Sequence, residues 1–242
     1  MKEKRVIEGI CALCGKQRKL SFEHVPPRAA FNNTPISVQN HVHLTDQTSH
    51  LYGKEMRSNK GSGGYTLCED CNNKTGVWYA SDFADFVHQG MSIIRELKTP
   101  SRLIKGIYQI KPLNVLKQIL TMFMSTDKSG YLRSKTDLID FILHKEKTGL
   151  PTIYEVYLYS TLSTKYRMFG FSWIADEIMG WQKWSEINFK PFGYLLAEES
   201  GPAHEYMCNI SKFGNFSYDE RVFVELTTGY LHIDSEWIGT YK

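Results

Sequence analysis

Four of the five cysteines stand in two pairs of identical spacing. The pairs read CALC at 11–14 and CEDC at 68–71, and Cys208 stands apart from both. Two such C-x2-C pairs can supply the four thiolates of a closed tetrahedral zinc site. A closed site has no open coordination position, so we expect the ion to hold structure rather than to catalyse. The predicted ligands of this structural Zn2+ ion are Cys11, Cys14, Cys68 and Cys71.

Two other uses of paired cysteines stay open at this point. Disulfides would suit a secreted chain, but the N-terminal stretch MKEKRVIEGICALCGK has no apolar segment of the kind found in signal peptides. A redox pair would need only one C-x2-C, placed in a thioredoxin-like context that this sequence does not show. We therefore keep zinc as the interpretation and expect a cytoplasmic protein.

The stretch RKLSFEHVPPR carries a second set of reactive side chains. Apolar and polar residues alternate from Lys19 to His24, which predicts a strand. The Pro26-Pro27 pair then stiffens the chain and stops further pairing. Glu23 and His24 should therefore lie at the end of a strand. Adjacent residues of a regular strand point to opposite faces, so a strand that continued regularly beyond His24 would remove Glu23 from the site.

The order of these features resembles the zinc-bearing, four-cysteine branch of the HNH endonucleases, also called ββα-metal or His-Me finger nucleases. The resemblance consists of a cysteine pair, a strand ending in acid-His-aliphatic-Pro, a long loop, and a second pair followed at once by Asn and a helix. It spans about residues 8–95, and nothing beyond about residue 100 contributes to it. The pattern occupies Cys11, Cys14, Glu23, His24, Val25, Pro26, Pro27, Cys68, Cys71 and Asn72.

The resemblance implies hydrolysis of phosphodiester bonds in DNA, with double-stranded DNA as the expected substrate. His24 matches the general base that activates water, because an unperturbed imidazole with a pKa of about 6.5 is largely neutral at working pH. Glu23 and Asn72 match the ligands of a catalytic Mg2+ or Mn2+ ion, since hard cations take carboxylate and amide oxygens. Asn73 is the second choice for the amide ligand.

Each of these residues has an ordinary structural use that stays open. A histidine at a strand end can simply pack against its neighbours. Glu23 can form a surface ion pair with Arg28, and Asn72 or Asn73 can cap the helix that follows.

The long polar loop between His24 and Cys68 holds further candidates. In the family a middle asparagine pins this loop, and the candidates here are Asn32, Asn33, Asn40 and Asn59. The stretch NKGSGG near its end can offer main-chain N–H groups to a phosphate, or form a flexible hairpin tip. The whole net charge of +3 lies within residues 1–100, which fits binding to nucleic acid. The candidate contacts are Arg28, Lys60 and Lys74.

Periodicity divides the chain into two parts. One helix is predicted from about residue 73 to 97, where apolar residues recur at helical spacing. We expect a nuclease module over 1–98 and an α+β accessory domain over 99–242. The second part should contain amphipathic helices over 112–125 and 134–146, and strands over 101–112, 152–160, 165–176, 192–200 and 220–228.

Together these features predict an α+β protein in which a zinc-stapled ββα-metal module precedes an α+β domain with an antiparallel sheet. No apolar run is long enough to span a bilayer, so no membrane partner is expected. The expected activity is that of a metal-dependent HNH endonuclease, in a setting such as phage defence. Residues 99–242 would be open to self-association or to a regulatory partner. The alternative is a catalytically inactive zinc-stapled module that binds nucleic acid or another protein.

Overall fold

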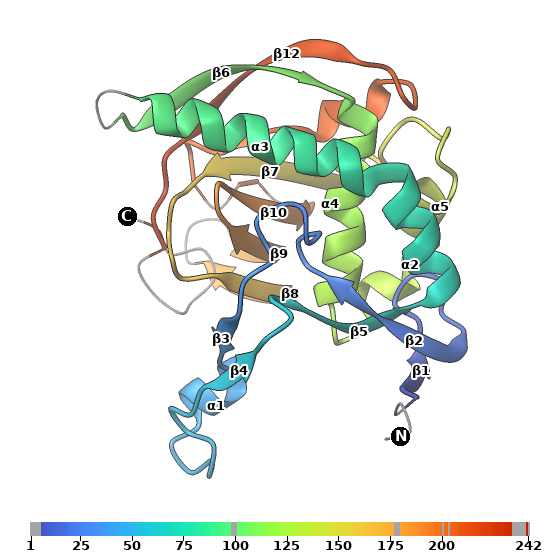
Figure 1. The fold of residues 1–242 in the computed structure, drawn as a ribbon, viewed down its shortest axis with the longest axis vertical. Helices are drawn as coiled ribbons and strands as arrows, with labels where there is room; N and C mark the ends of the chain where they lie inside the picture. Colours follow the sequence, from blue (N-terminus) through green and yellow to red (C-terminus); the bar gives the residue numbers. More distant parts are fainter. Residues whose placement is uncertain are drawn as a thin grey trace.

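The computed structural model describes residues 6–97, 101–176, 180–199, 201–202, 204–233 and 241 (Figure 1). Its named strands pair antiparallel in a three-stranded sheet β1-β2-β5, a five-stranded sheet β11-β7-β10-β9-β8 and the two ribbons β12-β6 and β3-β4. The prediction of a mixed chain with antiparallel sheet is confirmed. Within the described residues, no helix has both the length and the apolar character needed to cross a membrane.

The N-terminal part is a small sheet followed by a long helical run. Its elements are β1 (Glu8–Ile10), β2 (Gln17–His24), β5 (Gly63–Cys68), α2 (Glu69–Thr75), the π-helical turn η1 (Gly76–Ala80) and α3 (Ser81–Glu96). β2 lies between β1 and β5 in the sheet. β5 passes into α2 at Cys68 with no loop between them. The second cysteine pair therefore sits where a strand becomes a helix.

The helix predicted over 73–97 begins earlier than expected. Cys68 occupies the N-cap position with an extended backbone, and α2 starts at Glu69. Asn72 and Asn73 are therefore inside the helix, and the expectation that one of them caps it is wrong. The start is set by the strand that enters the helix directly, which sequence periodicity alone does not reveal. The predicted end is confirmed, because α3 ends at Glu96.

Between β2 and β5 the chain leaves the sheet as a projecting arm. The arm contains β3 (Ile36–Val38), α1 (His41–Thr45) and β4 (Met56–Ser58). β3 pairs with β4, so the excursion closes on itself as a ribbon. Figure 1 shows the arm extending away from the rest of the molecule, while its two ends return to the neighbourhood of β2 and β5.

The second part is built around α4 (Pro112–Thr126). The helix predicted over 112–125 is confirmed as α4, but every residue from Pro112 to Ser125 is buried, so the helix has no exposed polar face over this stretch. The helix is enclosed because α3, α5, η1, η3 and the large sheet all contact it. Two of its polar side chains find partners inside: Asn114 donates to Asp82 at 2.7 Å, and Thr121 donates to a main-chain carbonyl one turn back. Gln118 Oε1 and Ser125 Oγ are buried without a hydrogen-bond partner among the described residues.

The remaining strands and helices enclose this helix. They are β6 (Leu103–Ile110), η2 (Leu132–Ser134), α5 (Thr136–Leu143), β7 (Tyr154–Ser160), β8 (Arg167–Asp176), β9 (Gly180–Phe189), β10 (Phe192–Glu198), β11 (Cys208–Asn209), η3 (Ser211–Asn215) and β12 (Val222–Gly229). The predicted second helix and the five predicted strands are confirmed. β9 is absent from the prediction because Gln182, Glu186 and Asn188 are polar although they are buried.

One apolar core joins the two predicted parts. Leu67 and Phe86 belong to the same buried cluster as Phe123 and Phe192. The rings of Phe86 on α3 and Phe192 on β10 stack with their centroids 4.7 Å apart. The division into 1–98 and 99–242 stays a prediction, and the buried apolar side chains are continuous across it.

Candidate metal centre and active site

The four paired cysteines meet between the β1–β2 turn and the start of α2. Their Sγ atoms all lie within 4.8 Å of one another, and Cys14 Sγ is 3.9 Å from Cys68 Sγ. A tetrahedral ion with metal–sulfur bonds of about 2.3 Å separates its ligand sulfurs by about 3.8 Å. The cluster therefore has the dimensions of a four-thiolate metal site. The prediction that these cysteines come together is confirmed.

The surroundings of the cluster favour the thiolate at Cys11 and the thiol at its neighbours, because the hydrogen bond with Cys11 raises the pKa of Cys71 and burial raises that of Cys14. The main-chain N–H groups of Cys14 and Cys68 donate to Cys11 Sγ at 3.5 and 3.3 Å. The Cys71 thiol, followed by these N–H groups, lowers the pKa of Cys11 to about 4. All five cysteines are free, and the 3.9 Å sulfur separation is far from the roughly 2.05 Å of a disulfide. Cys208 lies apart in β11.

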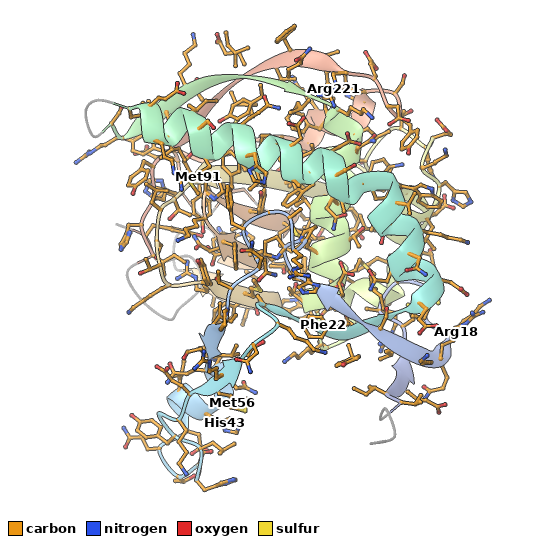
Figure 2. The ribbon with its side chains drawn as sticks, in the orientation of Figure 1. Arg18, Phe22, His43, Met56, Met91 and Arg221 are labelled. Atoms are coloured by element: carbon orange, nitrogen blue, oxygen red, sulfur yellow. The ribbon has the colours of Figure 1, made fainter. Side chains whose placement is uncertain are left out.

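His24 is the last residue of β2. Arg18 and Phe22 mark the two ends of this strand in Figure 2, and the ring of Phe22 meets the His24 ring edge-on at 4.9 Å. Burial lowers the pKa of His24, a hydrogen bond to the Lys60 main chain opposes this, and the charges of Arg28 and Lys60 lower it further. The lowered pKa favours the neutral imidazole at pH 7, which is the form that accepts a proton.

Glu23 faces the other side of β2 from His24. The residue is only 6% exposed, and burial raises the pKa of its carboxyl group to about 7. Within the described part of the chain, the carboxyl group has no hydrogen bond or ion pair, so the expected alternative of a pair with Arg28 is not formed. A buried carboxylate without a partner is costly. A bound cation would remove that cost.

Asn72 reaches back from α2 to β2. Its Nδ2 donates to Ser21 Oγ at 2.9 Å and to the Phe22 carbonyl at 3.3 Å. Side chains two residues apart on a strand share a face, so Glu23 lies on the same side of β2 as Ser21 and Asn72. No hydrogen bond to Asn72 Oδ1 is found among the described residues. Asn73 is exposed.

Asn72 thus contacts β2 at Ser21 and Phe22, and His24 ends the strand. Among the described residues, no hydrogen bond or ion pair joins Glu23 to Asn72 or to His24. β2 ends at His24, but Glu23 and His24 point to opposite faces of the strand, so the requirement that both side chains face one site is not met by the regular part of β2. One further main-chain bond follows, from Val25 N to the Ser62 carbonyl at 3.1 Å.

Asn32 holds together the two ends of the loop that connects β2 to β5. It is 1% exposed, and its Nδ2 donates to the carbonyls of Pro26 and Ser62, both at 2.7 Å. The Ser62 N–H donates to Asn32 Oδ1 at 2.7 Å. These three bonds, which we call the Asn32 clamp, tie the segment after β2 to the segment before β5. The other candidate asparagines, Asn33, Asn40 and Asn59, are exposed.

Two glycines make this close approach possible. A Cβ on Gly61 would lie 2.4 Å from Asn32 Oδ1, and one on Gly63 would lie 2.1 Å from the Glu23 carbonyl oxygen. Both residues have positive φ, a region that glycine enters without strain. Gly61 and Ser62 are buried, so this part of the NKGSGG stretch is packed and the flexible-tip alternative is wrong for it.

The predicted nucleic-acid contacts Arg28, Lys60 and Lys74 are all exposed. Arg28 and Lys60 stand close enough to His24 to act on its charge. Lys74 lies one residue beyond Asn73 on α2. Among the described residues, only the four clustered cysteines form a group of three or more His, Cys, Asp or Glu side chains at metal-binding distance.

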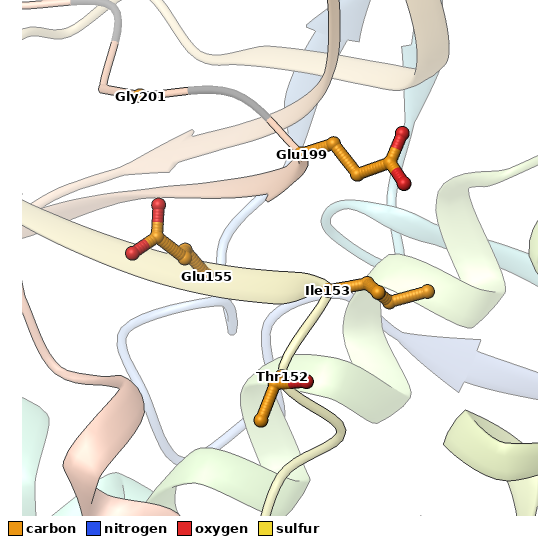
Figure 3. Close-up of a pocket in the computed structure, with 5 residues that line it drawn as sticks. All are labelled: Thr152, Ile153, Glu155, Glu199 and Gly201. Atoms are coloured by element: carbon orange, nitrogen blue, oxygen red, sulfur yellow. The ribbon is translucent and has the colours of Figure 1, made fainter.

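A pocket elsewhere involves none of these residues. It is lined by Thr152, Ile153, Glu155, Glu199 and Gly201 (Figure 3). Both carboxylates already have partners: Glu155 accepts hydrogen bonds from the Tyr157 hydroxyl and the Asn209 amide, and Glu199 lies 3.5 Å from Lys183. The pocket therefore offers no obvious reactive group.

In comparisons with known proteins, no family model, no curated protein and no solved structure matches this chain. The resemblance to the HNH nucleases therefore rests on the residues of this chain and on their arrangement alone.

Proposed function

We propose that this protein is a metal-dependent endonuclease of the HNH type that hydrolyses phosphodiester bonds in double-stranded DNA. The observation that carries the proposal is the order and contact of β2, β5 and α2. Two antiparallel strands are joined by a long excursion and followed directly by a helix, as in a ββα-metal module. Glu23 and His24 are the last two residues of β2, and Asn72 contacts this strand at Ser21 and Phe22, which supports the proposal.

The four cysteines hold a structural Zn2+ ion in this proposal. The sulfur separations support it, because zinc binds four thiolates in tetrahedral geometry. Four protein ligands leave no open position, so the ion fixes the β1–β2 turn to the start of α2. Since α2 carries Asn72, zinc binding also fixes this side chain against β2.

Glu23 and Asn72 Oδ1 would hold a divalent cation, Mg2+ or Mn2+, with Asn73 as the second choice. When bound, such an ion neutralises charge on the scissile phosphate and on the leaving oxygen. Two observations support these ligands. The buried Glu23 carboxyl group lacks a partner, and Asn72 is anchored through its nitrogen, which leaves its oxygen for a ligand.

His24 would act as the general base. Its neutral imidazole takes a proton from a water molecule, whose oxygen attacks the phosphorus while the bond to the leaving oxygen breaks. The main chain of Lys60 orients the ring, and the Asn32 clamp holds the residues next to Lys60. Arg28, Lys60 and Lys74 would contact the phosphate backbone.

The test is cleavage of supercoiled plasmid DNA with Mg2+ or Mn2+ by the zinc-loaded protein. His24→Ala should slow nicking by roughly 10²- to 10⁴-fold, the usual contribution of a general base. His144→Ala is a matched control, because this histidine is 69% exposed on the far end of α5 and should leave the rate unchanged. Equal cleavage by wild type and His24→Ala, or no cleavage by either, would overturn the nuclease assignment.

The same preparation distinguishes the alternatives. DNA binding that weakens with salt, with no cleavage by the wild-type protein, would indicate an inactive nucleic-acid-binding module. Absence of salt-dependent DNA binding would indicate a protein-interaction role instead.

A further inference from the structure

One face of the β2–β5 pair carries a row of aromatic rings that the proposed chemistry does not use. Phe22 on β2 is paired with Tyr65 on β5, and their rings meet with centroids 5.5 Å apart. Phe22 also meets the His24 ring at 4.9 Å. Tyr65 is 40% exposed, so the row reaches solvent. The candidate base therefore lies at one end of an aromatic row and Tyr65 at the other.

Lys60 lies over this row. Its Nζ is 4.9 Å from the centroid of Phe22 and 5.5 Å from that of Tyr65, and it donates to the Tyr65 hydroxyl oxygen at 3.3 Å. Its main chain is also held, since the imidazole of His24 bonds to it and the nearby Ser62 is part of the Asn32 clamp. The ammonium group is therefore placed by a fixed stretch of backbone next to the site.

The charge on Lys60 is not neutralised. No carboxylate pairs with it within the described residues. Lys105 on β6 differs in this respect, because it forms an ion pair with Glu225 at 2.9 Å. Arg28 and Lys60 both act on His24 as positive charges. The neighbourhood of His24 therefore presents two exposed cations to solvent.

The contact between Lys60 and Tyr65 leaves hydrogen-bond donors available. The Tyr65 oxygen accepts from Lys60, so its own hydroxyl proton is left for an external acceptor. The ammonium group also keeps two further N–H donors. Lysine stems often cover apolar rings, but that alone does not account for two adjacent donors beside an unpaired charge. A phosphate, with several acceptor oxygens, fits this arrangement.

We propose that Lys60 and Tyr65 form a subsite for a DNA backbone phosphate adjacent to the phosphate cleaved at His24. The inference rests on the proposed nuclease function and names a contact within it. The ammonium group and the phenolic hydroxyl donate to non-bridging oxygens of one phosphate. Phe22 sets the spacing between this phosphate and His24, because it touches both the histidine and the tyrosine.

The test measures binding of a short fluorescent DNA duplex across a range of salt concentrations, with no divalent ion added. Lys60→Gln should weaken binding and flatten the plot of log K against log[salt] by about 0.9, the effect of losing one phosphate contact. Tyr65→Phe should weaken binding several-fold with the slope unchanged, because it removes a neutral donor. Lys105→Gln is the control and should leave both the affinity and the slope as in wild type.

Plasmid cleavage by the same variants gives a second reading. Lys60→Gln and Tyr65→Phe should raise KM more than they lower kcat, because the subsite binds substrate before and during the reaction alike. Zinc content and circular dichroism check that both variants are folded.

The binding and cleavage results test the phosphate subsite and the nuclease assignment independently of each other. A wild-type slope in Lys60→Gln, with binding intact, overturns the subsite whether or not the wild-type protein cleaves. A flattened slope in a protein that cleaves nothing keeps the subsite as a DNA contact and rejects the nuclease. Absence of duplex binding by the wild type overturns the subsite.

Discussion

The cysteine-bearing region and the region around α4 reach an ordered fold by different means. In the first, the three short strands β1, β2 and β5 and the seven-residue α2 surround four converging sulfurs. In the second, every residue from Pro112 to Ser125 is buried in a continuous core. In the proposed zinc-bound form, the ion would cross-link the first region locally, between the β1–β2 turn and the start of α2. The second region gains its stability from apolar burial.

Removing the metal should have the largest effect and should act on the first region. Zinc binding by small cysteine sites is worth roughly 10–16 kcal/mol in isolated peptides. Cys71→Ser, or a chelator, should abolish hydrogen-exchange protection in β2, β5 and α2 while α4 keeps its own. Cys208→Ser, outside the cluster, should bind zinc as wild type does. Simultaneous loss of protection in α4 would show that the two regions unfold as one unit.

Truncating a core side chain near α4 should lower the free energy of unfolding and leave zinc binding unchanged, the reverse of what metal removal should do. Phe123 is fully buried in α4, and Phe123→Ala should lower the free energy of unfolding by about 3–5 kcal/mol through lost contacts and a cavity. Zinc content should not change. Phe223 is 73% exposed on β12, so Phe223→Ala should change stability by no more than about 0.5 kcal/mol. Guanidinium titration and zinc analysis measure both effects, and equal losses in the two variants would contradict the contrast.

The Asn32 clamp should matter mainly near the candidate site. Asn32→Ala leaves buried polar groups of Pro26 and Ser62 unpaired, which should cost about 1–3 kcal/mol. Amide exchange should quicken at Ser62 and plasmid cleavage should fall. The neighbouring Asn33 is exposed, and Asn33→Ala should do neither. Wild-type exchange at Ser62 in Asn32→Ala would show that the clamp does not hold this loop.

The smallest predicted effect concerns Lys117 and the change of the free energy of unfolding with pH. For this residue the stability should rise as the pH rises. Its Nζ lies among apolar side chains and donates to the carbonyls of His144 and Lys145 at 2.7 and 3.0 Å. Burial lowers the pKa of Lys117 from 10.5 to about 7. Between these values the unfolded chain binds more protons than the native one, so the Lys117 contribution to stability rises with pH.

Urea unfolding at pH 7 and 8 measures this contribution. From pH 7 to pH 8 the gain should be about 1 kcal/mol. Lys117→Met should remove that gain, while Lys212→Met, at an exposed lysine of η3, should keep it. A pH dependence in Lys117→Met identical to that of the wild type would contradict the assignment of the lowered pKa to this residue.

The parts of the fold that follow from local pattern are predictable from the sequence. The spacing of each cysteine pair brings two sulfurs together by itself, and the alternation before His24 marks the end of β2. These two features depend on neighbours in sequence, which is why residue types and spacing suffice. The placement of Asn72 inside the helix is different, because β5 enters α2 directly at Cys68, which sequence periodicity does not reveal.

Other features depend on partners far along the chain. Asn32 is one of four similar asparagines in the loop, and only its bonds to Ser62 distinguish it. The ammonium group of Lys117 is accommodated in the core because the main-chain carbonyls of His144 and Lys145, which follow α5, accept its hydrogen bonds. Tyr65 joins the row at His24 only through the register of β5 on β2. No local periodicity carries this information.

The closure at Asn32 divides the excursion between β2 and β5 into two stretches of different consequence. The hydrogen bonds from Asn32 to Pro26 and Ser62 hold the segments next to His24 together. The paired strands β3 and β4 lie beyond these bonds, in the outer part of the excursion. Lengthening a loop costs little, about 0.6 kcal/mol for each doubling, once its ends are fixed. The tip of the excursion, beyond the contact of the His41 ring with Phe169 on β8, can therefore be lengthened, shortened or exchanged for a foreign sequence while the geometry around His24 is kept.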